Sequence, residues 1–425
     1  MKLVVKKTTK LKGSIEIPAS KSHTIRAVIL ASLANGTSKL LNPLKSEDSM
    51  AAVNACKALG AKIKLGKKEW TIKGFGKNPK KPKKKIDFAN SGTSSRLLIG
   101  VMAALGIEAV VDGDASLRTR PMKPLFDGLK QLGLKVKYLK KQGFFPAKIS
   151  GKINGGKTTV NGKSSQYVSS PLIAAPLCEN DTEIKVVQMR EQPYIELTLK
   201  WLDEHKIKYT KKGFTHFKVK GNQSYKPFKK RIPGDWSSAA FPIVAAAVTN
   251  SNVLVKGVDI KDVQGDKEII SYLKKMGAKI KIEKNGIRII GKTLKGKAID
   301  LGHTPDALPA MSIAGCFALS TTTLKNVAQA RIKETDRIAV MTKELKKMGA
   351  SVKELPAGMI IKHSQLKGAK VKGHNDHRVV MALSVAGLIA EGKTEIDSAE
   401  SVNVTFPDYV KKMKKLGCKM EVLRN

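Results

Sequence analysis

The sequence predicts an α/β protein built from six similar repeats, three in each of two domains. Three observations lead to this prediction. The chain has 425 residues, which is long for a single hydrophobic core. A helix ending in glycine recurs about every seventy residues, and an unusually apolar helix recurs with the same period. Repetition at a fixed spacing indicates an architecture assembled from one structural unit.

The first recurring element is an amphipathic helix that ends in Leu-Gly-Ala or a similar triplet and leads into a short strand. The glycine position of this triplet falls at residues 60, 133, 206, 277, 349 and 417. Position 206 is a lysine, so that copy is weaker. A glycine at a helix end favours the left-handed conformation that closes the last turn. In the fourth repeat, Asn285-Gly286 between two apolar segments predicts a β-hairpin.

The second recurring element is an Ala-rich helix that is apolar on all sides, which is typical of a buried helix. These helices include residues 97–105, 239–248, 310–319 and 379–390. A small or polar cluster opens each copy, and the clusters lie at Lys21, Gly92, Ser164, Asp235, Asp306 and Asp376. Each repeat is therefore expected to pair one buried helix with one outer helix and a few strands.

The repeats divide the chain into two predicted domains. Junctions are expected near Pro18 and Gly234. Residues 19–234 would then form an inserted domain with three repeats. Residues 1–18 plus 235–425 would form a discontinuous domain with the other three. The chain would cross between the domains twice.

Composition excludes several classes of protein. A hydrophobic fraction of 41% is enough for packed cores and argues against disorder. No apolar run approaches the ~20 residues of a membrane-spanning helix, and the first residues lack the apolar stretch of a secretion signal. The four cysteines have no metal-binding or disulfide-like spacing, so reduced thiols in a cytoplasmic protein without a bound metal are expected.

The formal net charge of +44 indicates attraction to anions. The run Lys80–Lys85 contains no interleaved aromatic residue, so we expect a solvated loop and only non-specific contact with nucleic acid. Only 11 of the 79 lysine and arginine residues are arginines. An arginine retained in such a lysine-rich chain points to a site that needs a planar, two-pronged donor for carboxylate or phosphate.

The starts of the apolar helices carry different polar and charged residues in each repeat. A helix N-terminus attracts phosphate and carboxylate, so these clusters are candidate anion sites. Ordinary explanations remain open for each cluster alone. Residues 20–26 can be a capped helix with solvated charges, Asp306 can be a helix cap, and residues 331–337 can be a solvated charge run. Solvation explains residues 375–378 poorly, because the helix that follows them is predicted to be buried.

Taken together, these motifs resemble the 5-enolpyruvylshikimate-3-phosphate synthase family of enolpyruvyl transferases. The matching segments occur in the family's order along the whole chain: Lys21-Ser22-His23-Thr24-Ile25-Arg26, Asn90-Ser91-Gly92-Thr93, Arg120-Pro121-Met122, Ser164-Ser165-Gln166, Pro305-Asp306, Lys333-Glu334-Thr335-Asp336-Arg337, Asn375-Asp376-His377-Arg378 and Thr405-Phe406-Pro407-Asp408-Tyr409. The resemblance implies a two-domain inside-out α/β barrel of six βαβαββ-type repeats. It also implies an active site in the cleft between the domains, open without ligand and closed with substrate.

The resemblance further implies the reaction. The enolpyruvyl group of phosphoenolpyruvate would be transferred to the 5-hydroxyl of shikimate 3-phosphate, with release of phosphate, by addition and elimination. Asp306 would take the hydroxyl proton. Glu334 would protonate the methylene carbon and later remove a proton from the resulting methyl group, while Lys333 and His377 would assist. No metal or organic cofactor is implied, and a monomer is expected.

The resemblance assigns substrate contacts as well. Those implied for shikimate 3-phosphate are Lys21, Ser22, Arg26, Ser164, Ser165, Gln166, Asp306, Gln329 and Lys333. Those implied for phosphoenolpyruvate are Lys21, Gly92, Arg120, Gln166, Arg337 and Arg378. Two positions depart from the family pattern. Val404 stands where the family often has a lysine, and Glu191 or a neighbour stands where it commonly has a shikimate-binding serine.

Two alternatives compete with this assignment. UDP-N-acetylglucosamine enolpyruvyl transferase shares the fold, but it typically has a reactive cysteine in the loop corresponding to residues 112–120. This chain has no cysteine there. A basic nucleic-acid-binding scaffold would use the positive charge but would leave the acid and base residues unexplained. Strongly salt-dependent retention on DNA would identify such a scaffold.

Overall fold

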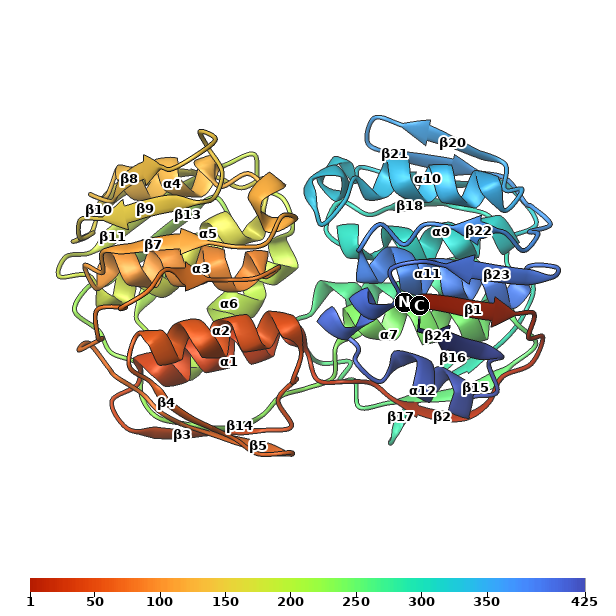
Figure 1. The fold of residues 1–425 in the computed structure, drawn as a ribbon, viewed down its shortest axis with the longest axis horizontal. Helices are drawn as coiled ribbons and strands as arrows, with labels where there is room; N and C mark the ends of the chain where they lie inside the picture. Colours follow the sequence, from red (N-terminus) through yellow and green to blue (C-terminus); the bar gives the residue numbers. More distant parts are fainter. Residues whose placement is uncertain (425) are drawn as a thin grey trace. The chain divides into compact units, whose positions relative to one another are not determined.

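The computed structural model describes residues 1–424, which form two compact units (Figure 1). One unit comprises Ala19–Ile232. The other combines Met1–Pro18 with the chain from Pro233 onward. Each unit contains three four-stranded sheets, and all six sheets in the described chain are open rather than closed into a barrel. The predicted α/β fold with six repeats is confirmed.

The unit Ala19–Ile232 contains three repeats, each with a buried and an outer helix. The buried helices are α1 (Lys21–Leu33), α3 (Gly92–Ala104) and α5 (Ser165–Ala174), and the outer helices are α2 (Glu47–Ala58), α4 (Lys123–Lys130) and α6 (Gln192–Glu204). The strands of the first sheet are, in spatial order, β14 (Lys229–Arg231), β3 (Thr37–Leu41), β5 (Glu69–Lys73) and β4 (Lys62–Leu65). Those of the second are β6 (Ile86–Asp87), β7 (Ala109–Asp112), β9 (Ala147–Ser150) and β8 (Lys135–Tyr138). Those of the third are β10 (Gly156–Asn161), β11 (Thr182–Val187), β13 (His216–Val219) and β12 (Tyr209–Lys212).

The second unit repeats this plan. Its buried helices are α7 (Trp236–Val248), α9 (Leu308–Phe317) and α11 (His377–Ile389), and its outer helices are α8 (Ile269–Lys275), α10 (Arg337–Lys347) and α12 (Tyr409–Lys415). The strands of its first sheet are, in spatial order, β2 (Lys12–Glu16), β15 (Asn252–Lys256), β17 (Gly286–Ile290) and β16 (Lys279–Glu283). Those of the second are β18 (Ala298–Asp300), β19 (Thr322–Lys325), β21 (Gly358–Ile361) and β20 (Val352–Leu355). Those of the third are β22 (Lys370–Val371), β23 (Lys393–Ile396), β1 (Lys2–Lys6) and β24 (Met420–Leu423).

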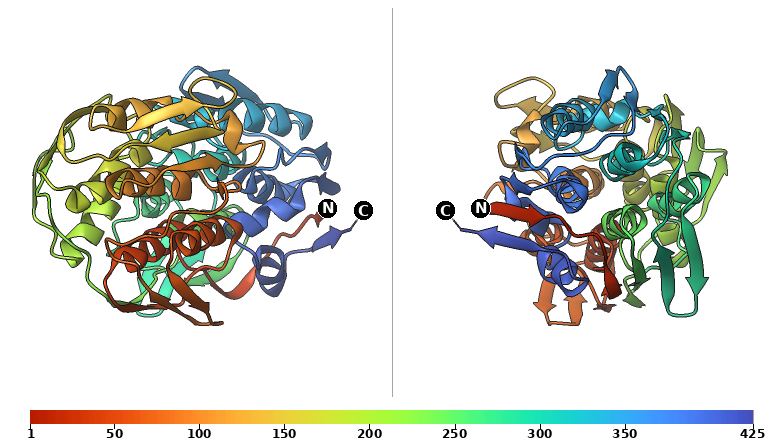
Figure 2. Two further views of the ribbon diagram at one scale, coloured as in Figure 1. Left: turned by 60° about the vertical axis from the view of Figure 1, so that its left-hand side comes forward. Right: turned by 90° about the vertical axis from the view of Figure 1, so that its right-hand side faces the viewer.

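All six sheets share one topology, with a parallel pair on one side and antiparallel pairs on the other. In four repeats the buried helix connects the two parallel strands along the chain. Two strands are exchanged between repeats, so that each joins a sheet away from the helix that follows it in the chain, and each pairs within its own unit. β2 directly precedes α1 in the chain but pairs with β15, whereas β14 directly precedes α7 but pairs with β3. The N-terminal strand β1 lies between β23 and β24, so the two chain ends are neighbours (Figures 1 and 2).

The buried helices form the cores. In α7 every residue is buried, and α7, α9 and α11 pack against one another. This arrangement confirms the prediction made from their apolar sequences. The predicted hairpin is also present, because β16 pairs antiparallel with β17 and Glu283 lies opposite Gly286.

The helix ends follow the predicted pattern as well. The five glycines at positions 60, 133, 277, 349 and 417 have φ values between 84° and 116°. Lys206, which replaces glycine in the third repeat, has the same left-handed backbone with φ of 57°. The structure of the repeat therefore imposes this conformation, even where the residue is not glycine.

Other predictions concern single features. The four cysteines are buried free thiols. The lysines of the run Lys80–Lys85 are exposed and lie outside any helix or strand, as expected for a solvated loop. Within residues 1–424 we find no helix with the length and apolar character needed to cross a membrane. The same residues contain no cluster of three or more His, Cys, Asp or Glu suited to a metal ion.

Candidate active site

The predicted site residues form one cluster in each unit. The unit Ala19–Ile232 holds Lys21, Ser22, Arg26, Gly92, Arg120, Ser164, Ser165 and Gln166. The other unit holds Asp306, Gln329, Lys333, Glu334, Arg337, His377 and Arg378. Within each unit, these side chains lie at the starts of helices or in the loops beside them.

Arg337 organises the cluster of the second unit. It is the first residue of α10, and its side chain is fully buried. Its guanidinium donates to Asp306 Oδ1 at 2.7 Å and to Glu334 Oε2 at 2.6 Å. It also donates from Nε and Nη2 to the two oxygens of Asp376, at 2.8 and 3.1 Å. One planar cation therefore holds three carboxylates, an arrangement that a lysine could not reproduce.

Arg378 completes the same cluster from the start of α11. Its Nη2 lies 3.1 Å from Asp306 Oδ2 and also donates to the Ser237 hydroxyl. Its Nη1 lies 2.7 Å from His377 Nε2. The ammonium of Lys333 lies 4.0 Å from Asp306 Oδ1. Asp306 is thus surrounded by three cations.

These charges control protonation. Burial alone would raise the pKa of Asp306, but the charges of Arg378, Lys333 and Arg337 outweigh burial and hold that pKa below its usual range. Burial would likewise lower the pKa of Arg337, but the carboxylates of Asp376, Glu334 and Asp306 raise it instead. Asp306 is therefore an ionised carboxylate paired with arginine cations.

Helix capping does not explain Asp306, and solvation does not explain Arg337. Asp306 lies in a 3-10 turn, Pro305–Ala307, and makes no capping hydrogen bond to α9. Arg337 is buried, so the charge run 331–337 is not simply solvated. Within this run Arg331 is partly exposed to solvent, where it pairs with Asp336 and Glu354. Gln329 is buried and donates from Nε2 to the Gly302 carbonyl at 2.7 Å.

In the other unit, the start of α1 holds a lysine and an arginine in defined contacts. Ser20 caps the helix by accepting from the His23 N–H, as predicted. The Lys21 ammonium lies 3.0 Å from Asp48 Oδ2. Arg26 donates to Thr198 Oγ1 at 2.9 Å and to the carbonyls of Ser22 and Tyr194. Burial lowers the pKa of Arg26 to about 10.

Hydrogen bonds join the starts of α3 and α5. The Gln166 side chain donates to Thr93 Oγ1 at 2.9 Å and accepts from Arg96 Nη1 at 2.6 Å. Arg120 donates to the carbonyl and side chain of Asn90 and to Ser116 Oγ.

Gly92 lies beside both guanidinium groups. A Cβ at this position would lie 3.2 Å from Arg96 Nη1 and 3.4 Å from Arg120 Nη1. Any side chain at residue 92 would therefore fill the space next to these two cations.

The remaining predicted contacts lie at the start of α5. Ser164 caps the helix by accepting from the Gln166 N–H. Both the N–H and the hydroxyl of Ser165 donate to the buried carboxylate of Glu191. Val404 ends a 3-10 helix, Ala399–Val404, that packs against α11, and its side chain is buried.

Several contact residues were not assigned from the sequence. Asp48 binds Lys21, Thr198 binds Arg26, Ser237 binds Arg378, and Asp376 binds Arg337. Asp376 and Ser237 stand at starts of buried helices, so the repeat pattern could have pointed to them. Asp48 and Thr198 lie on outer helices, where the sequence carries no comparable signal.

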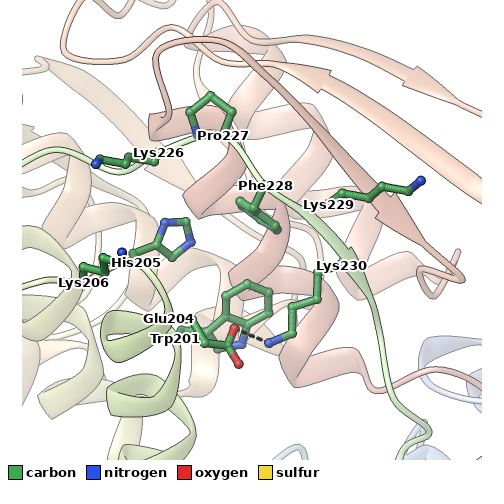
Figure 3. Close-up of a pocket in the computed structure, with 9 residues that line it drawn as sticks. All are labelled: Trp201, Glu204, His205, Lys206, Lys226, Pro227, Phe228, Lys229 and Lys230. Atoms are coloured by element: carbon green, nitrogen blue, oxygen red, sulfur yellow. Dashed lines mark hydrogen bonds and ion pairs between the residues drawn. The ribbon is translucent and has the colours of Figure 1, made fainter.

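The unit Ala19–Ile232 also contains a cavity of about 460 Å³ between the end of α6 and residues 226–230 (Figure 3). Its lysines do not converge, because Lys226 and Lys229 point in opposite directions. Its acidic residue, Glu204, is paired with Lys230. None of the predicted site residues, all of which the structure describes, lines this cavity.

Comparison with known proteins gives consistent matches. The family model for EPSP synthase (3-phosphoshikimate 1-carboxyvinyltransferase) matches residues 5–413. A curated 3-phosphoshikimate 1-carboxyvinyltransferase from Acetivibrio thermocellus is 48% identical over 419 residues, covering 98% of each chain. One from Methanocaldococcus jannaschii is 43% identical over 428 residues, covering 99% of each. The solved structure of EPSP synthase from Acinetobacter baumannii matches with a TM-score of 0.85 and 29% identity, over 100% of both chains.

Proposed function

This chain belongs to the EPSP synthase family, and on that premise we propose how its side chains share the work of the reaction. The chain transfers the enolpyruvyl group of phosphoenolpyruvate to the 5-hydroxyl of shikimate 3-phosphate, a step of the shikimate pathway. UDP-N-acetylglucosamine transfer is not favoured, because the curated relatives named here are all 3-phosphoshikimate 1-carboxyvinyltransferases.

One observation carries the proposed division of roles. Asp306 and Glu334 are bound to the same guanidinium, that of Arg337, so two carboxyl groups lie on neighbouring nitrogens of one rigid group. Addition of an alcohol to the enol carbon needs a base at the hydroxyl and an acid at the methylene carbon. We assign Asp306 as the base and Glu334 as the acid.

Substrate binding prepares these groups. Phosphoenolpyruvate carries a carboxylate and a phosphate, and both compete with Asp306 and Glu334 for Arg337 and Arg378. A carboxyl group that loses an arginine and gains a neighbouring anion holds a proton more readily. Asp306 thereby becomes a stronger base than in the free protein, and Glu334 can carry the proton that it gives to carbon.

The addition and elimination then balance. The 5-hydroxyl oxygen bonds to C2 of phosphoenolpyruvate while its proton passes to Asp306, and Glu334 gives a proton to C3. In the elimination Glu334 takes a proton back from the methyl group, the C2–C3 double bond re-forms as the C2–O bond to phosphate breaks, and the departing phosphate takes the proton held by Asp306. Lys333, His377, Arg337 and Arg378 stabilise the charge that develops, as fixed cations and donors do in an enclosed site.

The other unit supplies the remaining proposed contacts. Lys21, Gly92, Arg120 and Gln166 would bind phosphoenolpyruvate. Shikimate 3-phosphate would contact Lys21, Ser22, Arg26, Ser164, Ser165 and Gln166, with Asp306, Gln329 and Lys333 from the second unit. Support for Gly92 comes from the space that its missing side chain leaves beside Arg96 and Arg120. We also propose that the chain acts as a monomer in the cytoplasm, where buried free cysteines are usual.

Phosphate release by the purified protein tests the function. Phosphate should appear only when phosphoenolpyruvate and shikimate 3-phosphate are both present. Equal release with UDP-N-acetylglucosamine in place of shikimate 3-phosphate would refute the assignment. Light scattering of the same preparation measures the mass and so tests the monomer.

A further inference from the structure

Glu191 is a buried carboxylate at the start of α6 that binds the start of a different helix. Its side chain is 2% exposed, and it makes no capping hydrogen bond to α6. Its Oε2 instead accepts from the Ser165 N–H at 3.0 Å and from Ser165 Oγ at 2.9 Å. Because Ser165 is the first residue of α5, this carboxylate occupies a position where a helix N-terminus favours an anion.

The two donors that Glu191 engages are those that the proposed function assigns to the substrate. The inference rests on that function, in which Ser164, Ser165 and Gln166 bind shikimate 3-phosphate. A carboxylate held by two donors is a favourable charge-assisted arrangement. A phosphate dianion and an ionised carboxylate cannot share the same serine favourably, because like charges brought together repel.

The start of α6 also contacts Arg26, another residue that the proposed function assigns to shikimate 3-phosphate. The Tyr194 carbonyl, one turn after Glu191, accepts from Arg26, and Thr198 accepts from the Nε of the same arginine. Thr198 in turn donates to Ser169 of α5. Glu191 therefore lies where α1, α5 and α6 meet, rather than at a remote end of the unit.

We propose that Glu191 is an internal competitor of the substrate phosphate and thereby sets the affinity for shikimate 3-phosphate. In the free protein its carboxylate fills the place of a phosphate oxygen at Ser165. When the substrate binds, the carboxylate leaves, and its lost hydrogen bonds weaken net binding. Glu191 is an affinity-determining residue in this scheme, not a catalytic one.

Two substitutions remove the competitor while respecting the backbone. Glu191 has φ of 53° and ψ of 39°, a left-handed conformation that glycine adopts without steric cost. Glu191→Gly should therefore fold, and it removes the carboxylate completely. Glu191→Gln keeps the shape and removes only the charge. The matched control is Glu196→Gln, an exposed glutamate on the same helix.

Titration calorimetry of the whole protein with shikimate 3-phosphate provides the test. Loss of a charged hydrogen-bonding competitor should lower the Kd about tenfold in Glu191→Gly and less in Glu191→Gln. The KM for phosphoenolpyruvate should stay unchanged, and Glu196→Gln should bind like the wild type. A general disturbance of the fold would weaken binding of both substrates instead.

Ser165→Ala separates this inference from the proposed function. If Ser165→Ala weakens binding but neither Glu191 variant binds more tightly than the wild type, the inference is wrong and the proposed site stands. If Ser165→Ala also binds like the wild type, the proposed phosphate contact and the inference both fail. Weaker binding in Glu191→Gln would show that the carboxylate assists the substrate, which also overturns the inference.

Discussion

Among single residues, Arg337 joins three carboxylates that have different tasks. Asp376 is fully buried and bound through both oxygens, and it also accepts from the Arg378 N–H at 2.9 Å. In the proposed function Asp376 therefore orients the arginine and does not contact a reacting atom. Asp306 and Glu334 each accept from Arg337 through one oxygen. They can therefore exchange Arg337 for a substrate more easily than Asp376 can.

Substitution of the two proposed reacting carboxyls should separate catalysis from binding. Asp306→Asn and Glu334→Gln keep the shape of the side chain but cannot carry out the proton transfers. We expect turnover to fall by roughly 10²-fold or more, as is typical for a lost general acid or base. Steady-state kinetics and titration with shikimate 3-phosphate measure the two properties. Glu283→Gln, at a glutamate paired with Arg288 on a hairpin, is the control; near-normal turnover in either site variant would contradict its role.

Stability should depend on acid in a defined direction. The pKa values of Asp306 and Asp376 are lowered in the folded protein, because burial is outweighed by neighbouring cations, chiefly Arg378 for Asp306 and Arg337 for Asp376. Their contribution to stability is therefore complete above the unfolded value of about 4 and is lost as the pH falls below it. Thermal unfolding between pH 7 and pH 3 measures this loss.

Asp376→Asn provides the comparison for that measurement. At pH 7 the variant should lose about 3 kcal/mol of stability, as expected when one partner of a buried ion pair is removed. Its melting temperature should also fall less steeply with acid than that of the wild type. An equally steep fall in both proteins would mean that other carboxylates govern the acid response.

Residue identities at the site could be predicted from the sequence far better than their contacts. The resemblance named Asp306, Glu334 and Arg337, but a cap was the ordinary expectation for Asp306. Its actual partners, Arg337 and Arg378, lie 31 and 72 positions further along the chain, and no local pattern reveals such pairing. Glu191 shows the same limit, because its bond to Ser165 depends on how two helices pack.

At the scale of elements, the repeat sets the backbone even where the sequence departs from it. The helix ends were predictable because glycine marks a left-handed residue. Lys206 adopts that conformation without the advantage of glycine. A residue with a Cβ in this region costs about 1–2 kcal/mol, so the third repeat is strained at this position.

A reciprocal pair of substitutions tests this explanation. Lys206→Gly should raise stability by about 0.5 kcal/mol, because relief of the strain exceeds the added flexibility of the unfolded chain. Gly349→Lys should lower stability by about 1 kcal/mol. Gly349 has φ of 84°, and a Cβ there would lie no closer than 3.7 Å to a neighbouring atom, so the change tests the backbone alone. Urea unfolding measures both; a loss of stability in Lys206→Gly would contradict the account.

Strand pairing marks the limit of prediction for the elements. Six repeats follow from the spacing of glycines and apolar helices. The exchange of β2 and β14 does not, because β2 lies 240 residues from its partner strand and β14 lies 190 residues from its own. Short alternating strands carry little information about which edge they join.

At the scale of the whole molecule, the proposed function divides its substrate contacts between the two units. We expect shikimate 3-phosphate to lower the radius of gyration in solution scattering, as ligand-driven closure does. Arg26→Ala should abolish the change at the same ligand concentration if it abolishes binding. An unchanged radius in the wild type, with binding confirmed by calorimetry, would show that no such closure occurs.

The strand exchange has a consequence for how the protein is made. A ribosome releases the N-terminus first, yet β1 has its partners, β23 and β24, at the other end of the chain. The unit Ala19–Ile232 is complete once β14 has emerged, whereas β2 waits for β15 and β1 waits for β23 and β24. During that interval β1 is an unpaired strand with three apolar side chains, Leu3, Val4 and Val5, a state prone to wrong association. The unit that joins Met1–Pro18 to the chain from Pro233 onward therefore folds late, and β1 is the segment that waits longest for its partners and most needs protection.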